Sequence, residues 1–330
     1  MKAINLLSIT INCLSVKRES DVTLKTVEWK SVENYTKDNF FDKFDFYNGP
    51  DPTEGIVEYV DKATAIANNL IGIQGDNVIF GGDSVKKAPN GRKSIRLESI
   101  NSYTYGLFVF DLEHMPSGCA TWPSTWFLGP DPWPLNGEFD ILEGVNLGKS
   151  NRVSIHTQKT CVVPINNTRM TGEYFYSPAD NVNINNTLIC GKDDKRKWGC
   201  QVDDPNTLSY GEAFNKNKGG VYVFLWEPTG AKVWFFTRNS IPSNIETPNP
   251  ASWGLPVLDF PFGPTCEQSN FKNHRIVINL TFCGSWAGVP SLYEGDGCPG
   301  KCEDLARDSP ESFKEAYWNY RSLRVYQKVQ

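Results

Sequence analysis

Three acidic side chains stand close together in an otherwise apolar stretch of the sequence. Glu138, Asp140 and Glu143 are separated by apolar residues, and a glycine borders the segment on each side. In a β-strand, residues two apart share a face, so Glu138 and Asp140 point to the same side. Strict alternation would send Glu143 to the opposite face, unless one extra residue forms a β-bulge. We therefore predict a bulge near residues 141–142 that returns Glu143 to the acidic face.

Three carboxyl groups held this close favour acid–base chemistry. Like charges disfavour joint ionisation, so at least one of the three pKa values should be raised. Hydrolysis of a glycosidic bond needs one ionised and one protonated carboxyl group. The long side chains of Glu138 and Glu143 could converge on a sugar, whereas the shorter Asp140 would bond a neighbour and tune its proton. A solvated acidic strand edge or a calcium site are the alternatives that this pattern alone leaves open.

Short strand-like segments recur between turn residues along the chain, which favours an all-β sandwich of antiparallel sheets. The clearest of them are residues 94–98, 106–112, 221–226, 231–236, 275–282 and 321–327. Residues 228–230 should join two of these strands into a hairpin. We expect one helix over residues 312–319, because Ser309 can cap it and Pro310 fits its first position.

Eight of the nine cysteines can form a disulfide framework. Apart from Cys13, they are Cys119, Cys161, Cys190, Cys200, Cys266, Cys283, Cys298 and Cys302. A zinc site is disfavoured, because none of the three histidines stands near a cysteine pair at zinc spacing. Closeness in sequence suggests the local pairs Cys190–Cys200 and Cys298–Cys302. Residues 161–210 hold three cysteines among many polar residues, so we expect a disulfide-braced excursion there.

The N-terminus suggests export from the cell. A basic start is followed by a mostly apolar run to residue 16 and then by polar residues, which indicates a signal peptide over residues 1–18. A buried N-terminal strand is the alternative reading of this run. Cleavage would remove Cys13, leave an even set of cysteines, and yield a secreted single domain over residues 19–330. No other segment reaches ~18 consecutive apolar residues, so we expect no transmembrane helix.

Composition indicates a neutral partner. The 330 residues carry a formal net charge of −5, which disfavours nucleic acid, and 13% are aromatic, including ten tryptophans. Such side chains can stack on flat ligands. We expect a monomer. Four sequons, at Asn34, Asn166, Asn185 and Asn279, would allow glycosylation.

The segment from Gly129 to Asn146 resembles the active-site strand of glycoside hydrolase family 16, and is most similar to that of the fungal laminarinase-like endo-1,3(4)-β-glucanases. Matching blocks follow in the family's order at residues 91–99, 111–116, 121–126, 154–157, 233–236, 281–288 and 317–318. The similarity extends over residues 41–327. It implies a β-jelly-roll sandwich with a concave substrate cleft, and retaining hydrolysis of internal β-1,3 or mixed β-1,3/1,4 glucan linkages through a covalent glycosyl-enzyme.

The resemblance also assigns roles to the three acids. Glu138 matches the nucleophile, Asp140 the residue that assists it, and Glu143 the acid/base. The extra residue before Glu143 matches the laminarinase-like strand and not the lichenase-like strand, whose acids alternate strictly. The implied ligand is a β-glucan polysaccharide or oligosaccharide. No cofactor and no catalytic metal are implied, while a structural calcium is left open.

Six further residues are candidates for substrate binding. They are Arg96, Trp122, Trp126, Trp133, His156 and Trp286. Arg96 should lie on the face opposite its apolar neighbours, where its guanidinium can donate to sugar hydroxyls. Each tryptophan could stack on a sugar or pack into the protein, and His156 could bond near the acids or be a core histidine. Ser285 stands where the family often has Asp, which could alter subsite preference.

Two other functions fit the same residues. A cell-wall glucan transglycosylase would form the same covalent intermediate and pass it to a sugar acceptor. A non-catalytic glucan-binding protein would use the sandwich alone, and the three intact acids argue against it.

Overall fold

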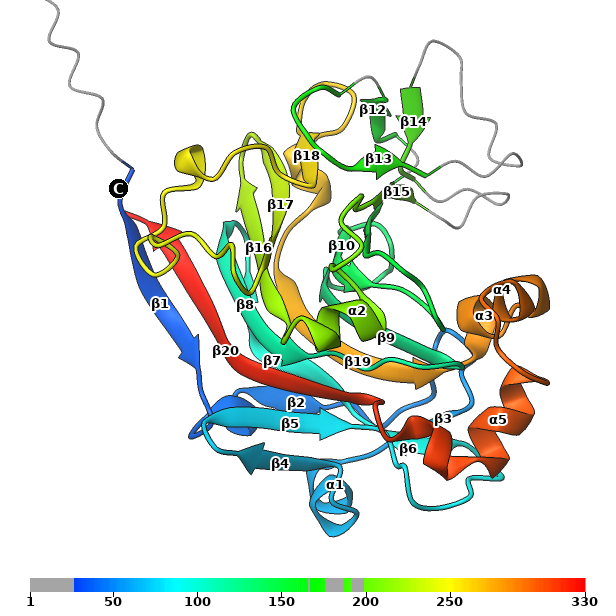
Figure 1. Ribbon diagram of the computed structural model, residues 1–330. Coiled ribbons are helices and arrows are strands. Elements are labelled where there is room, and N and C mark those ends of the chain that lie inside the picture. Colours follow the sequence, from blue (N-terminus) through cyan, green and yellow to red (C-terminus); the bar gives the residue numbers. More distant parts are fainter. Residues whose placement is uncertain (1–26, 159, 166, 176–186, 192–198, 330) are drawn as a thin grey trace, which may run out of the picture.

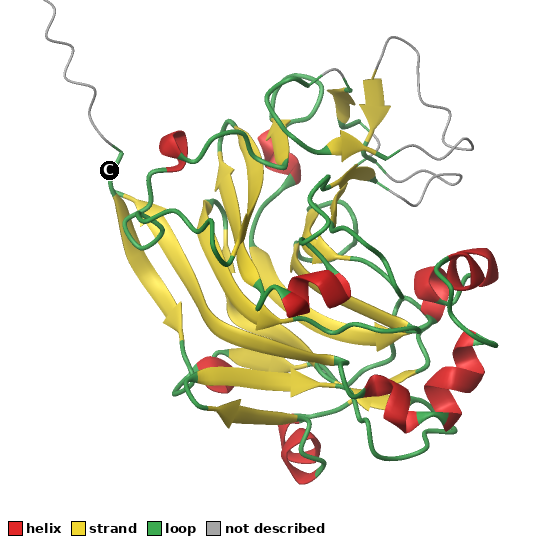
Figure 2. Ribbon diagram, in the orientation of Figure 1, coloured by secondary structure: helices red, strands yellow, loops and turns green. Residues whose placement is uncertain are grey.

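The protein is described by a computed structural model that covers residues 27–329, except 159, 166, 176–186 and 192–198. Two large antiparallel sheets make up most of the molecule, and the helices are few and short (Figures 1 and 2). The predicted all-β sandwich is therefore confirmed. The N-terminal segment, including the expected signal peptide and Cys13, lies outside the described residues.

The first sheet has the order β18 (Leu258–Pro261), β17 (Gly230–Thr237), β16 (Gly220–Glu227), β8 (Gly106–His114), β20 (Tyr317–Lys328), β5 (Asn77–Gly81) and β4 (Ile71–Gln74), and β1 (Trp29–Tyr35) also pairs with β20. The second has the order β13 (Glu173–Tyr174), β15 (Cys200–Asp203), β11 (Arg152–His156), β10 (Glu138–Glu143), β9 (Thr121–Leu128), β19 (His274–Phe282), β7 (Arg96–Tyr103) and β2 (Phe44–Phe46). Strand β10, which carries the three acids, is thus flanked on both sides.

Shorter elements complete the fold. Two small sheets pair β12 (Val162–Pro164) with β14 (Thr187–Ile189) and β3 (Val57–Tyr59) with β6 (Arg92–Ser94). The α-helices are α1 (Lys62–Ala67), α2 (Gly211–Lys216), α3 (Gly284–Ala287), α4 (Pro290–Gly295) and α5 (Cys302–Asp308). The 3-10 helices are η1 (Phe40–Asp42), η2 (Pro250–Ser252), η3 (Gln268–Asn270) and η4 (Pro310–Phe313).

Aromatic rings from both sheets meet in the core behind β10. Phe108 and Phe224 come from the first sheet, and Phe127 and Phe139 from the second. The ring of Phe224 lies 4.8 Å from that of Phe127 and 5.1 Å from that of Phe139. Such pairs contribute about 0.5–1.5 kcal/mol each beyond the area they bury. Phe139 therefore anchors the back of the strand whose front carries the acids.

Two predictions about local structure differ from the fold. The strand expected over residues 94–98 is interrupted at Ile95, whose carbonyl accepts the Leu280 N–H at 3.2 Å. The helix expected over residues 312–319 is wrong, because only the 3-10 helix η4 forms and β20 begins at Tyr317. Trp318 and Tyr320 are fully buried and stack near Phe80, so tertiary packing outweighs the local helix signal. The β16–β17 hairpin is confirmed, with Glu227 opposite Gly230.

Among the described residues, four disulfides form: Cys119–Cys298, Cys161–Cys266, Cys190–Cys200 and Cys283–Cys302. The pair Cys190–Cys200 and the braced excursion are therefore confirmed, and the pair Cys298–Cys302 is wrong. Cys298 and Cys302 lie in one buried cluster with Cys283, at the end of β19, and each bonds a partner other than its sequence neighbour. The Cys119–Cys298 bridge spans 179 residues and the Cys283–Cys302 bridge 19, and together they attach the α3–α5 region next to the ends of β9 and β19.

Candidate active site

Strand β10 contains the predicted bulge. Asp140 pairs with Trp126 and Leu142 with the adjacent Thr125, so Ile141 is the extra residue. Glu143 then pairs with Ser124. Because Ser124 and Trp126 are two apart on β9, they share a face, and Glu143 therefore returns to the side of Asp140. Ile141 is fully buried in the core on the opposite side.

The glycines on either side of the acidic strand leave no room for a side chain. Gly137 has a φ of +81°, and a Cβ there would lie 2.2 Å from the Phe271 ring. A Cβ on Gly144 would lie 2.6 Å from the ring of Tyr210, which is only 1% exposed. Buried rings pack against the backbone at both ends of β10, so they help to fix where the acids stand.

Substituting Gly144 by alanine should therefore destabilise the protein by about 1–3 kcal/mol, the usual cost of overpacking a core. Thermal unfolding followed by circular dichroism would measure the change. The matched control is Gly72→Ala on β4, where a new Cβ meets nothing within 4 Å. Equal melting temperatures for the two variants would contradict the packing argument.

An indole N–H bonds each of the two glutamates. Trp133 Nε1 donates to Glu138 Oε2 at 2.7 Å, and Trp122 Nε1 donates to Glu143 Oε1 at 2.9 Å. Trp133 comes from the loop before β10 and Trp122 from β9. Each glutamate therefore has one oxygen bonded to an indole N–H.

His156 on β11 lies beside the acids. Its Nε2 is 3.3 Å from Asp140 Oδ2 and 3.8 Å from Glu138 Oε1, and it pairs directly with Glu138 across the sheet. Of the two alternatives for this histidine, the structure supports the one in which it contacts the acids.

The remaining predicted binding residues lie on the same face. Arg96 contacts Glu98 at 2.9 Å, and its guanidinium lies 5.2 Å from the Trp126 ring. Trp126 donates to Asn279 Oδ1 at 2.7 Å. The Trp286 ring meets that of Trp122 edge to face at 5.4 Å. We call this set the carboxylate face: Glu138, Asp140, Glu143, Arg96, Trp122, Trp126, Trp133, His156 and Trp286.

Several residues of this region escape prediction from the sequence. In the sequence, Asn279 is noticeable only as a sequon. In the structure, the residue is 8% exposed and its side chain bonds Trp126 and Tyr59, so it is a poor glycosylation acceptor. Asn34 is exposed, and the other two sequons lie outside the described residues. The charge of Arg152 acts on Glu143. Arg152 and His156 lie four residues apart on β11 and so share a face, and this spacing could have revealed Arg152 as a site residue. Asn151 gives no signal in the sequence.

Burial raises the pKa values of all three acids, and the charge of Asp140 adds to the shift of both glutamates. Burial, followed by the charge of Asp140, raises the pKa of Glu138 to about 8, while His156 and the Trp133 hydrogen bond oppose the shift. Burial and Asp140 also raise the pKa of Glu143 to about 8, against Trp122, His156 and Arg152. Burial raises the pKa of Asp140 well above its usual value. The cluster therefore retains a proton near neutral pH, as a general acid requires.

Glu138, Asp140 and His156 could also hold a cation, because one ligand atom from each lies within 4.8 Å of the others. Calcium prefers an all-oxygen set, which the imidazole does not provide. In the described part of the chain, no other group of three His, Cys, Asp or Glu residues is placed to bind a metal.

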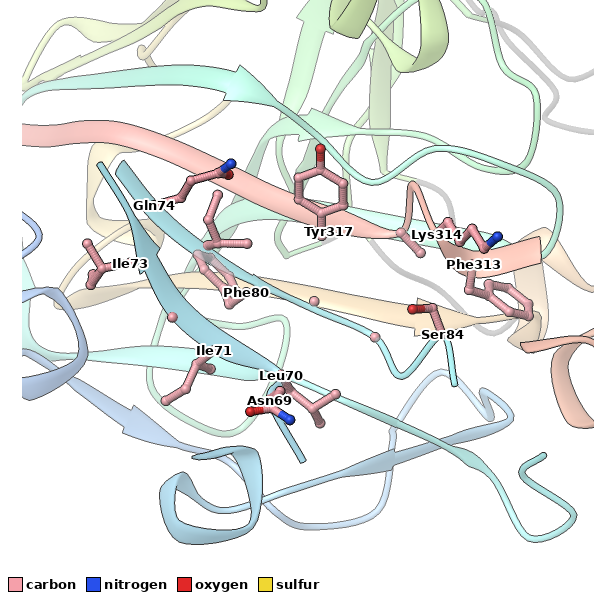
Figure 3. A pocket seen from close by; sticks show the side chains of 15 residues that line it. Asn69, Leu70, Ile71, Ile73, Gln74, Phe80, Ser84, Phe313, Lys314 and Tyr317 are labelled. Atoms are coloured by element: carbon pink, nitrogen blue, oxygen red, sulfur yellow. The ribbon is translucent and has the colours of Figure 1, made fainter. Parts of the chain in front are cut away.

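A separate pocket of about 350 Å³ lies between β4, β5 and the start of β20 (Figure 3). Its lining includes Ile73, Phe80, Lys314 and Tyr317. It contains no residue of the carboxylate face, so it takes no part in the chemistry of the three acids.

Comparison with known proteins gives a consistent result. The family profile described as "XgeA-like, catalytic GH16 domain" matches residues 44–326. A probable glycosidase of Schizosaccharomyces pombe is 43% identical over 314 residues, which are 94% of this chain and 72% of the relative. An endo-1,3(4)-β-glucanase of Arthroderma benhamiae is 36% identical over 305 residues, covering 90% of this chain and 64% of that protein. The chain thus spans less than two thirds of the latter enzyme.

Solved structures of family 16 enzymes share the fold of this chain. Laminarinase 16A from Phanerochaete chrysosporium, with β-glucans in its donor and acceptor sites, has a TM-score of 0.82 and 40% identity over 91% of this chain and 99% of that one. An elongating family 16 β-1,3-glucosyltransferase has a TM-score of 0.81 and 34% identity, covering 91% of this chain and all of that chain (100%).

Proposed function

The chain belongs to glycoside hydrolase family 16, and from this premise we propose that it is a retaining endo-1,3(4)-β-glucanase acting on internal β-1,3 or mixed β-1,3/1,4 linkages. The observation that carries the proposal is the bulge at Ile141. It places Glu143 on the face of Glu138 and Asp140, with an indole N–H on each glutamate.

In the proposed reaction, Glu138 attacks the anomeric carbon while Glu143 protonates the departing sugar oxygen. The covalent glycosyl-enzyme is then hydrolysed by a water that Glu143, now ionised, deprotonates. Burial raises the pKa of Glu138 to about 8, and the charge of His156 and the Trp133 hydrogen bond oppose this shift, so these two contacts favour the ionised nucleophile. Burial, followed by the charge of Asp140, raises the pKa of Glu143 to about 8, which favours the protonated acid. This cycle requires no cofactor.

Retention can be tested directly on laminarin oligosaccharides. Proton NMR during the first minutes should show the β-anomer of the new reducing end before mutarotation produces the α-anomer. Initial release of the α-anomer would exclude the double displacement. Binding of laminarin without release of reducing ends would instead indicate a non-catalytic glucan-binding protein.

A second candidate function is transglycosylation, favoured by the similarity to the elongating glucosyltransferase. Such an enzyme would transfer the glycosyl group from Glu138 to a sugar acceptor and not to water. Products longer than the substrate, at high oligosaccharide concentration, would favour this function over hydrolysis.

The proposal extends to location and assembly. Four disulfides fit a protein that works in an oxidising environment, as a secreted enzyme acting on a polysaccharide would. No helix in the described ranges is long and apolar enough to cross a membrane. We propose a secreted monomer.

A further inference from the structure

The bulge that returns Glu143 to the carboxylate face also interrupts pairing on the other side of β10. The ladder to β11 contains Glu138 opposite His156 and ends at Asp140 opposite Ser154. Beyond that point, the backbone of residues 141–143 has no strand partner on the β11 side. Buried backbone groups without partners are costly, so the carbonyl of Ile141 and the N–H of Glu143 need another source of hydrogen bonds.

The side chain of Asn151 supplies both bonds. Its Nδ2 donates to the carbonyl oxygen of Ile141 at 2.8 Å, and its Oδ1 accepts the backbone N–H of Glu143 at 2.8 Å. One primary amide thus offers the donor and the acceptor that the backbone of a neighbouring strand would offer. One bond is to the bulged residue Ile141, and the other is to Glu143, the residue that must be aimed.

Asn151 is itself firmly held. The residue is fully buried, its own N–H donates to Ser209 Oγ at 2.9 Å, and its carbonyl accepts the Asp204 N–H at 2.9 Å. The carbonyl of Ser209 in turn accepts the hydroxyl of Tyr222 on β16, in the first sheet. The amide that holds the bulge is therefore connected to the core of the sandwich.

We propose that Asn151 is a positioning residue for Glu143, which rests on the acid/base role proposed above for that glutamate. The backbone of Glu143 is fixed by Asn151, and its carboxyl group by Trp122. Removing the amide would let the bulge relax and move the acid away from the glycosidic oxygen. A displacement of about 1 Å at a reacting group can cost on the order of 10²-fold in rate.

Two substrates separate positioning from general structural damage. A laminari-oligosaccharide has a sugar leaving group that must be protonated, whereas a 2,4-dinitrophenyl β-laminaribioside has a leaving group that departs without a proton. Asn151→Ala should lower kcat/KM for the oligosaccharide by about 10–100-fold. For the dinitrophenyl glycoside the loss should be several-fold smaller, because the first step there does not use the acid.

The matched control is Asn215→Ala. The Asn215 side chain also pairs one backbone N–H and one backbone carbonyl, both of Met115 and both at 2.9 Å, but it lies outside the carboxylate face. This variant should lose comparable stability and leave the ratio of the two kcat/KM values at the wild-type level. Asn151→Asp retains the acceptor for the Glu143 N–H and, with its buried carboxyl group protonated, a donor for the Ile141 carbonyl. It should therefore show the same selectivity with a smaller loss, and it replaces Asn151→Ala if that variant does not fold.

Wild-type protein and Glu143→Gln are measured alongside. No wild-type activity on either substrate would mean that the proposed function has failed. Suppose that Glu143→Gln loses activity selectively on the oligosaccharide. If a folded Asn151 variant then loses activity equally on both substrates, or loses none, the positioning role alone is overturned.

Discussion

Replacing Glu138 by glutamine should reduce kcat for laminarin on the order of 10⁴-fold or more, the scale seen when an enzyme loses its nucleophile. Glutamine has nearly the same shape as glutamate, and its amide cannot form the glycosyl ester. Trp133 can still donate to the amide oxygen, so the fold around residue 138 should be retained. Release of reducing ends from laminarin measures the loss.

The role of Glu138 has a specific signature in a second variant. Glu138→Ala leaves space for azide, which should attack the anomeric carbon from the side that the carboxylate occupied and yield the α-glycosyl azide. Glu173→Gln on the edge strand β13 is the control, because Glu173 is exposed and outside the carboxylate face. A Glu138→Gln enzyme with wild-type turnover would remove Glu138 from the mechanism.

Glu138→Gln should also stabilise the folded protein at neutral pH. The pKa of Glu138 is raised from 4.5 to about 8, so the folded state retains a proton that the unfolded chain releases. Stability is therefore complete below about pH 4.5 and falls as the pH rises toward 8. Glutamine has no proton to lose, so the variant should melt a few degrees higher than wild type at pH 7, with the gain vanishing near pH 4.

Sequence reasoning located the acids because a strand has a fixed period. The single extra residue before Glu143 breaks the alternation of Glu138 and Asp140, and a bulge is the simplest way to restore it. The same rule placed Arg96 opposite its apolar neighbours, whereas the sequence left two alternatives open for His156. These predictions succeeded because they depend on neighbouring positions along one strand.

The disulfide and helix predictions that failed concern residues whose structure is decided by contacts with other segments of the chain. Cys298 and Cys302 are close in sequence but bond Cys119 and Cys283, because the cluster in which they lie brings four cysteines together. Trp318 fits a helix by its local sequence, but burial in the core places it on β20.

Asn151 was missed for a related reason. Its role exists only because a bulge eight to ten residues earlier leaves a carbonyl and an N–H without partners. Alternation can predict that a bulge exists, but which side chain satisfies it is a property of the assembled sheet.

Replacing Glu143 by glutamine should lower kcat/KM for laminarin by about 10²–10⁴-fold, the usual contribution of a general acid. The loss should be much smaller for a dinitrophenyl β-glycoside, because that leaving group needs no proton. The pKa of Glu143, about 8, predicts the basic limb of the wild-type pH profile: activity requires the protonated acid and should fall above about pH 8. In Glu143→Gln this limb should be absent.

The second half of the cycle distinguishes Glu143 from Glu138. With the dinitrophenyl glycoside, Glu143→Ala can still form the glycosyl-enzyme, because that leaving group needs no acid. Without its base, this intermediate reacts slowly with water, so it should accumulate and be visible by mass spectrometry. Azide needs no base, and its attack on the intermediate should restore turnover and yield the β-glycosyl azide, the anomer opposite to that from Glu138→Ala. If both alanine variants gave the same anomer, the two glutamates could not occupy opposite ends of a double displacement. Opposite anomers would fix both roles, because each azide product records the face from which the missing carboxylate acted.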